Sequence, residues 1–186
     1  MFCNREGEQV PHAVFKLSAT IPAQSVTAKD IFSKKKVVVF AVPGAFTYPY
    51  STIHVLGYNS YEEVFRANGI DDIICISVND PFVLARWAKQ MGVSRIRFIP
   101  DVSGKFTQGM GMLMSLADKG MGQRSWRYSM LVEDGIIQKM FVERNGLEAW
   151  PEVSDAETML HYVNPNVVKP KKALALMQMW KAMLSA

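Results

Sequence analysis

The segment 47–51 lies where a helix is expected to begin directly after a buried strand, so it is a natural place for chemistry. The apolar, β-branched run 36–42 predicts that strand, and a Pro-Gly pair ends it. Main-chain N–H groups at a helix start carry partial positive charge, which favours an anion. If Thr47 is the N-cap, its hydroxyl should accept from the N–H of Tyr50, because Pro49 has none to donate.

Other reactive side chains are few and scattered. The chain has two cysteines and three histidines: Cys3, Cys75, His12, His54 and His161. Cys75 lies in an apolar run without an adjacent cation, so we expect a raised pKa and an inert core thiol, and nothing near Cys3 activates it. His54 follows Tyr50 by one helical turn and could line the rim of a site, although a surface or helix-contact role fits better. No spacing indicates a metal site, and we expect no cofactor.

Length and composition indicate one globular domain. The chain has 186 residues, of which 49% are hydrophobic and 20% charged, with a formal charge of +4. Its basic runs are too short for a nucleic-acid surface, and no apolar run approaches the roughly 20 residues that span a bilayer. The polar N-terminus does not have the pattern of a signal or transit peptide. Two distant cysteines favour reduced thiols and a cytoplasmic protein.

The hydrophobic pattern predicts alternating strands and helices. We expect strands at 10–17 (or an extended arm there), 25–26, 36–42, 71–78, 96–99, 128–133 and 136–143. Helices are expected at 28–32, 47–67, 81–91, 106–116 and 154–163. Gly57 is the weak point of the longest helix, and 120–122 is a flexible loop. Asp134-Gly135 should form a hairpin turn, and Ser154 should open a capping box.

This order of elements predicts an α/β fold with a central mixed β-sheet flanked by helices. It is the thioredoxin-like order, with an extra C-terminal helix. Residues 1–163 should form one domain, and 164–186 a linker and a C-terminal amphipathic helix. The apolar stripe over 171–184 either packs on its own domain or docks a second subunit or partner.

Several segments carry a resemblance that covers nearly the whole chain. They are Pro43-Gly44-Ala45-Phe46-Thr47, Ser77-Val78-Asn79-Asp80-Pro81-Phe82-Val83 and Arg124-Ser125-Trp126-Arg127-Tyr128. Together these segments resemble the peroxiredoxin family of redoxins, and in particular its group numbered five. The resemblance implies a thioredoxin-like fold and thiol-dependent reduction of hydrogen peroxide and alkyl hydroperoxides, without a cofactor.

The resemblance also implies roles for individual residues. Pro43 would shield the reaction site, and Thr47 would contact the thiolate and the peroxide. Arg127 would lower the thiol pKa and polarise the peroxide. The family pattern Pro-x-x-x-Thr-x-x-Cys, however, places its peroxidatic Cys where this chain has Tyr50. The neighbouring Tyr48-Pro49 also departs from the usual Pro-Thr, which indicates a remodelled loop.

A tyrosine cannot replace the family's nucleophile. A thiolate attacks the O–O bond and becomes a sulfenic acid, whereas a phenol oxygen has no such chemistry. We therefore expect a peroxidase-deficient binding, structural or regulatory homologue. The alternative is an active thiol peroxidase that uses Cys75 or Cys3. The site itself is either a retained anion pocket or is filled by Tyr50, whose hydroxyl would then bond Arg127 or Thr47.

The resemblance implies partners as well. We expect a homodimer built around the active-site loops. Its contact could include the aromatic residues Trp126, Phe82, Tyr48 and Tyr58. If the chain is active, thioredoxin or glutaredoxin with glutathione would be the reductant. Some relatives continue into a glutaredoxin domain, and we expect no built-in electron donor here.

Overall fold

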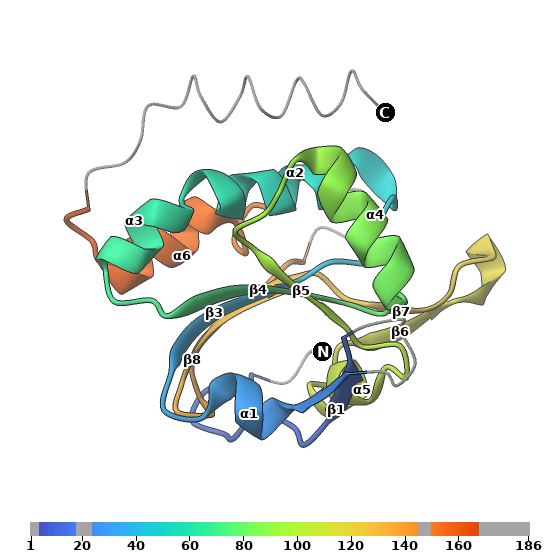
Figure 1. Ribbon diagram of the computed structural model, residues 1–186, viewed down its shortest axis with the longest axis horizontal. Coiled ribbons are helices and arrows are strands. Elements are labelled where there is room, and N and C mark those ends of the chain that lie inside the picture. The colour runs from blue at the N-terminus through green and yellow to red at the C-terminus, as the bar shows by residue number, and fades with distance from the viewer. Residues whose placement is uncertain (1–3, 18–23, 145–149, 168–186) are drawn as a thin grey trace.

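The computed structural model describes residues 4–17, 24–144 and 150–167, in which strands are interspersed with helices along the chain (Figure 1). The strands are β1 (Val14–Lys16), β2 (Ser25–Thr27), β3 (Lys36–Ala41), β4 (Asp72–Ser77), β5 (Arg97–Pro100), β6 (Leu113–Leu116), β7 (Gly122–Ser125), β8 (Tyr128–Glu133) and β9 (Ile136–Val142). The helices are α1 (Ala28–Phe32), α2 (Tyr48–Ser60), α3 (Glu62–Ala67), α4 (Pro81–Met91), α5 (Lys105–Gly109), η1 (Ala117–Lys119, a 3-10 turn) and α6 (Ala156–Val163).

Five strands form the central sheet in the order β5-β4-β3-β8-β9. The first three are parallel to one another, whereas β8 and β9 pair in antiparallel fashion. Asp134 and Gly135 both have positive φ in the tight turn between β8 and β9, as an Asp-Gly hairpin turn requires. The predicted mixed sheet and its hairpin are therefore confirmed.

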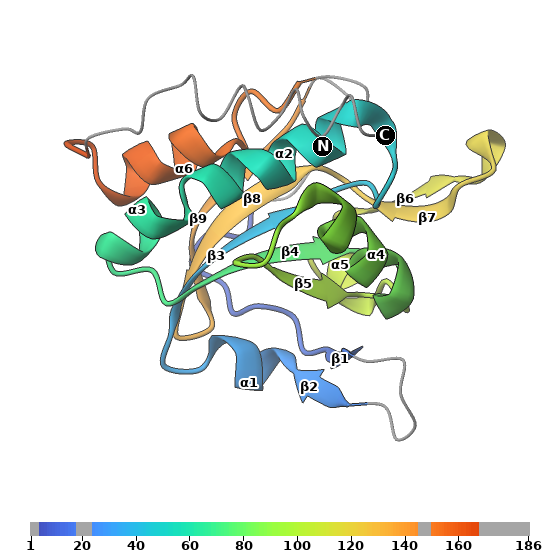
Figure 2. The same cartoon turned by 45° about the horizontal axis from the view of Figure 1, so that its top comes forward.

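Helices cover both faces of this sheet (Figures 1 and 2). Val38 and Phe40 of β3 point toward α2, α3, α4 and α6, and Val37 and Val39 point toward α1, α5 and β1. All four side chains are fully buried, which explains why this strand is apolar at every position rather than at alternate ones. The predicted thioredoxin-like layers, with a C-terminal helix α6, are present.

The N-terminal segment runs along the outer strand β9. The N–H of Gly7 donates to the carbonyl of Ile137 at 2.8 Å, and the N–H of Ile137 donates to Glu8 at 2.9 Å. The Glu6 carboxylate accepts from the N–H of Met140 and pairs with Lys139. This cover satisfies main-chain groups that an edge strand otherwise leaves open.

The helix predicted over 106–116 is wrong beyond its first turns. Helix α5 ends at Gly109, and Gly111 adopts a left-handed φ of 72° that a helix cannot continue through. Residues 113–116 instead form β6, which pairs with β7 across the glycines of 120–122. The expected flexible loop is therefore the tip of a hairpin that projects from the body of the molecule (Figure 2).

The long helix predicted over 47–67 is divided into α2 and α3. The break falls at Tyr61, not at the expected Gly57. The buried Tyr61 side chain donates its hydroxyl to Glu157 of α6 at 2.8 Å. Packing against α6 fixes this side chain, so a tertiary contact is associated with the break.

Helix α6 begins one residue later than the proposed capping box. Asp155 is the N-cap, and its carboxylate accepts from the N–H groups of Glu157 and Thr158. Ser154 turns into the protein interior instead, where it is fully buried. The amphipathic helix predicted over 171–184 lies outside the described residues.

A buried carboxylate organises the turn between β5 and α5. Asp101 accepts from the N–H of Thr107 at 2.8 Å, from its hydroxyl at 2.7 Å and from the N–H of Phe106 at 3.4 Å. These bonds satisfy two of the free N–H groups at the start of α5. Phe106, which they position, is fully buried against the sheet.

We expect Asp101→Ala to lower the free energy of unfolding by about 3 kcal/mol, because it leaves buried donors without an acceptor. Thr107→Val removes only the hydroxyl and should cost about 1 kcal/mol. Urea denaturation of both variants and the parent chain measures the difference. Equal stability of Asp101→Ala and the parent would contradict this role.

Candidate functional site

The loop between β3 and α2 is held by a side-chain amide. The N–H of Ala45 donates to Asn79 Oδ1 at 2.9 Å, and the Ser77 hydroxyl donates to the same oxygen at 2.7 Å. Gly44 leaves space at this point, because a Cβ there would lie 2.6 Å from Thr47 Oγ1. Phe46 has a φ of 58°, so the loop reverses sharply before the helix begins.

Thr47 is the N-cap of α2 by position, but its side chain does not cap the helix. Its hydroxyl donates to the carbonyl of Ala45 at 3.3 Å, and the residue is buried. The predicted bond from the N–H of Tyr50 is therefore wrong. Pro49 occupies the first helical turn as expected.

Tyr50 meets Arg127 through its main chain. Arg127 Nη1 donates to the carbonyl oxygen of Tyr50 at 3.3 Å. In one of the two alternatives, the Tyr50 ring fills the site and its hydroxyl bonds Arg127 or Thr47. The Tyr50 residue is only half-buried, so its side chain does not sit fully inside the core.

The Arg127 guanidinium is completely removed from solvent. Burial lowers the pKa of Arg127 to about 10, while the charges of Glu143 and, to a smaller extent, Cys75 act in the opposite direction. The side chain therefore stays cationic at neutral pH. It supplies a fixed positive charge beside the first turn of α2.

Glu143 is a buried acid that the sequence analysis did not identify. Its Oε1 accepts from the N–H of Val153 at 3.0 Å, and from the N–H and hydroxyl of Ser154 at 2.7 and 2.8 Å. Its own N–H donates to the carbonyl of Arg127 at 3.1 Å. The only sequence signal for this buried acid was its position directly after the apolar residues of β9. Glu143 thus binds the segment before α6 through its carboxylate and Arg127 through its main-chain N–H.

His54 is buried rather than on the surface. Its Nε2 donates to the carbonyl of Ser154 at 2.9 Å, and its ring packs 5.0 Å from that of Phe40. Burial, and then the charge of Arg127, lowers the pKa of His54 to about 3. The imidazole is therefore neutral at physiological pH. The helix-contact role is correct, and a role at the rim of an open site does not fit this burial.

Arg124 brings a second cation to the loop. Its Nη1 donates to the carbonyl of Val78 at 3.1 Å, and its Nε lies near Gly44, 3.6 Å from where a Cβ would be. The Nε is buried without a hydrogen-bond partner among the described residues. Two arginines from one short segment thus reach the region between β3 and α2.

The thiol of Cys75 lies in the core. It lies in β4, fully buried between Phe40 and Phe98 of the neighbouring strands. Burial raises its pKa well above the usual range, and the charge of Arg127 offsets this only in part. The expectation of a core thiol with a raised pKa is confirmed. Cys3 lies outside the described residues.

Within residues 4–17, 24–144 and 150–167, no group of three or more His, Cys, Asp or Glu side chains could hold a metal ion. The same residues contain no helix that is both long and apolar enough to cross a membrane.

Similarity to known proteins identifies the family of this chain. The family model described as Redoxin matches residues 5–160. The chain belongs to the redoxin family.

The hybrid peroxiredoxin hyPrx5 of Haemophilus influenzae is 46% identical over 86% of this chain, and the match spans 66% of that protein, just under two thirds. Peroxiredoxin sll1621 of Synechocystis is 45% identical over 89% of this chain and 97% of its own length, so this redoxin is a peroxiredoxin.

Solved structures of peroxiredoxins share the fold. Reduced Prx3 from Vibrio vulnificus in complex with hydrogen peroxide has a TM-score of 0.79 and 34% identity, covering 87% of this chain and all of that one. Peroxiredoxin 5 from Alvinella pompejana has a TM-score of 0.76 and 29% identity, covering 88% and 100%. The thioredoxin-like arrangement of this peroxiredoxin is thus shared along most of its length.

We expect the buried His54 to make this peroxiredoxin sensitive to acid. The unfolded chain binds a proton at a pKa near 6.5, but the folded chain does so only near 3. Stability is therefore complete above pH 6.5 and falls as the pH drops toward 3, by about 2 kcal/mol between pH 7 and pH 5.

His54→Gln should remove this part of the pH dependence, while His161→Gln, which changes an exposed histidine of α6, should keep it. Urea unfolding at a series of pH values checks both variants. The same slope for His54→Gln and the parent chain between pH 5 and 6.5 would refute the assignment.

Proposed function

We propose that this peroxiredoxin lacks thiol peroxidase activity and works as a binding or regulatory member of its family. The observation that carries this proposal is Tyr50 in the first turn of α2, with its carbonyl held by Arg127. Family resemblance places the peroxidatic sulfur at this position. A phenol there cannot form the sulfenic acid on which turnover depends.

The surroundings support loss of the nucleophile rather than loss of the whole site. Thr47 remains buried in the loop, and Arg127 remains cationic beside the helix start. An arginine and a helix N-terminus would stabilise a thiolate at position 50 if one were present. We therefore assign Thr47, Tyr50 and Arg127 to the site, with Tyr50 as the residue that blocks the chemistry.

Cys75 is a poor substitute nucleophile. Its raised pKa keeps it as a thiol, and its position between β3 and β5 closes it to substrate. An active enzyme based on Cys75 or Cys3 is the competing proposal. A thioredoxin, or glutaredoxin with glutathione, would then be its reductant.

We also propose a homodimer in which the loops around the site meet. Two aromatic side chains near the loop are exposed, Phe46 by 54% and Phe82 by 69%. The Phe46 ring lies 6.3 Å from that of Trp87, so the exposed pair adjoins the core of α4. Tyr58, expected to contribute to this contact, is instead completely buried and stacked on Phe40.

The parent chain should consume hydrogen peroxide no faster than its Cys3→Ser/Cys75→Ser variant in an assay coupled to thioredoxin or to glutaredoxin and glutathione. The triple variant Tyr48→Pro/Pro49→Thr/Tyr50→Cys restores the family loop and should gain turnover, because the cationic site is intact. The matched control carries Ser instead of Cys at position 50 and should stay inactive.

Turnover by the parent chain that disappears in the cysteine-free variant would overturn the proposal in favour of an active enzyme. Mass spectrometry with a sulfenic-acid trap then shows whether Cys75 or Cys3 reacts. An inactive triple variant with the parent's stability would show that more than the sulfur has been lost.

Phe82→Asp should shift a dimer toward monomers by at least about tenfold in dissociation constant, because it places a charge in an apolar contact. Sedimentation velocity at several concentrations measures the change. Val102→Asp alters another exposed apolar side chain, on the β5–α5 loop, and should leave association unchanged. A parent chain that is monomeric at all concentrations would contradict the dimer.

A further inference from the structure

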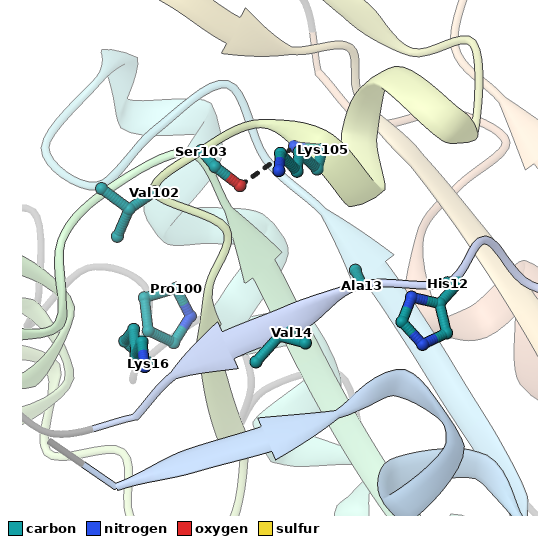
Figure 3. Close-up of a pocket in the computed structure, with 8 residues that line it drawn as sticks. All are labelled: His12, Ala13, Val14, Lys16, Pro100, Val102, Ser103 and Lys105. Atoms are coloured by element: carbon teal, nitrogen blue, oxygen red, sulfur yellow. Dashed lines mark hydrogen bonds between the residues drawn. The ribbon is translucent and has the colours of Figure 1, made fainter.

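A separate pocket of about 520 Å³ lies between β1 and the loop that joins β5 to α5 (Figure 3). Its walls come from two segments that are distant in sequence. They are His12, Val14 and Lys16 on one side, and Val102, Ser103 and Lys105 on the other. The volume falls in the range of about 300–1,000 Å³ that is common for small-molecule sites. None of the residues assigned to the peroxiredoxin site lines this pocket.

The pocket has an apolar part. Ala13 and Pro100 line it and are themselves buried, so they mark its inner surface. Val14 and Val102 are apolar side chains that remain largely exposed beside it. A ligand with a short hydrocarbon group would bury the exposed surface of these two valines, which favours binding.

The described residues that line the pocket carry only positive charge. Lys16 and Lys105 contribute two ammonium groups, and His12 adds an imidazole. The Lys16 Nζ donates to the Ser25 hydroxyl of β2 at 2.8 Å, which leaves its other two N–H groups for a ligand. None of the described lining residues is acidic. The nearby Asp101 directs its carboxylate to the start of α5 instead, as described above.

The main chain of β1 also offers hydrogen bonds to this pocket. The N–H of Leu17 donates to Gln24 and that of Ala28 donates to Ala13, so alternate residues of β1 bond to β2. Val14 and Lys16 stand in the non-bonded positions of this register, and their N–H and C=O groups point to the opposite edge. In Figure 3, β2 lies on one side of β1 and the loop of the pocket on the other.

We propose that this pocket binds a carboxylate attached to a short apolar group. The two lysines and the N–H groups at the open edge of β1 would hold the carboxylate, and the valines, Ala13 and Pro100 would contact the apolar part. A free organic acid has this chemistry, and so does the carboxyl end of a peptide chain with an apolar last residue. Binding requires no redox step and does not depend on the state of Tyr50.

Titration of the ¹⁵N-labelled chain, followed by ¹H–¹⁵N NMR spectra, tests the site. The probes are octanoate, its neutral analogue octanamide, and a short peptide ending in valine with either a free or an amidated carboxyl end. Octanoate or the free-acid peptide should cause saturable shift changes confined to residues 12–16 and 102–105. Whichever of these two ligands binds with the higher affinity indicates the source of the carboxylate.

Variants test the charge of the pocket and its free volume separately. Lys16→Gln/Lys105→Gln should weaken the affinity about tenfold through loss of two exposed ion pairs. Lys29→Gln/Lys89→Gln removes two exposed lysines elsewhere and should not change it. Val102→Trp should fill the pocket and abolish binding while leaving the other resonances in place.

Equal affinity for octanoate and octanamide would overturn the proposal, because charge would then play no part. The same is true if both lysine pairs weaken binding equally, or if saturation moves resonances only outside the two segments. Absence of saturable shifts with every carboxylate at millimolar concentration would also reject it. Binding that survives Val102→Trp would place the ligand elsewhere.

Discussion

The buried charge of Arg127 is the constraint on which the rest of the site depends. A guanidinium without solvent is costly unless an opposite charge and hydrogen-bond acceptors surround it. Glu143 supplies the charge, and the carbonyl of Tyr50 accepts one of the bonds. Glu143 is in turn fixed by the main chain and hydroxyl of Ser154. One buried cation thus links the start of α2, the end of β9 and the approach to α6.

Burial is the main reason why the histidine and the thiol near Arg127 are both uncharged. Burial, and then the positive charge of Arg127, disfavours protonation of His54, so the pKa of this imidazole lies far below neutrality. Burial outweighs the same charge at Cys75 and keeps the thiol protonated. Near Arg127, the imidazole of His54 is therefore neutral and the thiol of Cys75 is protonated at neutral pH.

The central sheet could be predicted because its signals are local. The run 36–42 is apolar on both faces, Asp134-Gly135 suits a tight hairpin, and Pro81 suits a first helical turn. The sequence patterns failed where a distant segment decides the outcome. Residues 113–116 have a helical pattern but pair with β7, and Tyr61 is fixed by Glu157 across the interface with α6.

For the site, sequence by itself determined the identity of the reactive atoms: an oxygen at position 50, a cation at 127 and one thiol within an apolar strand. It also determined the family and the sheet, because these depend on patterns of neighbouring residues. Tertiary structure alone decided that Glu143 faces Arg127, that Thr47 bonds Ala45 instead of capping its helix, and that β1 forms a cationic pocket with a distant loop. These features depend on contacts between segments that are far apart in the chain. Packing sets the burial and the charge environment of each side chain at such contacts. A pattern of neighbouring residues does not encode that packing.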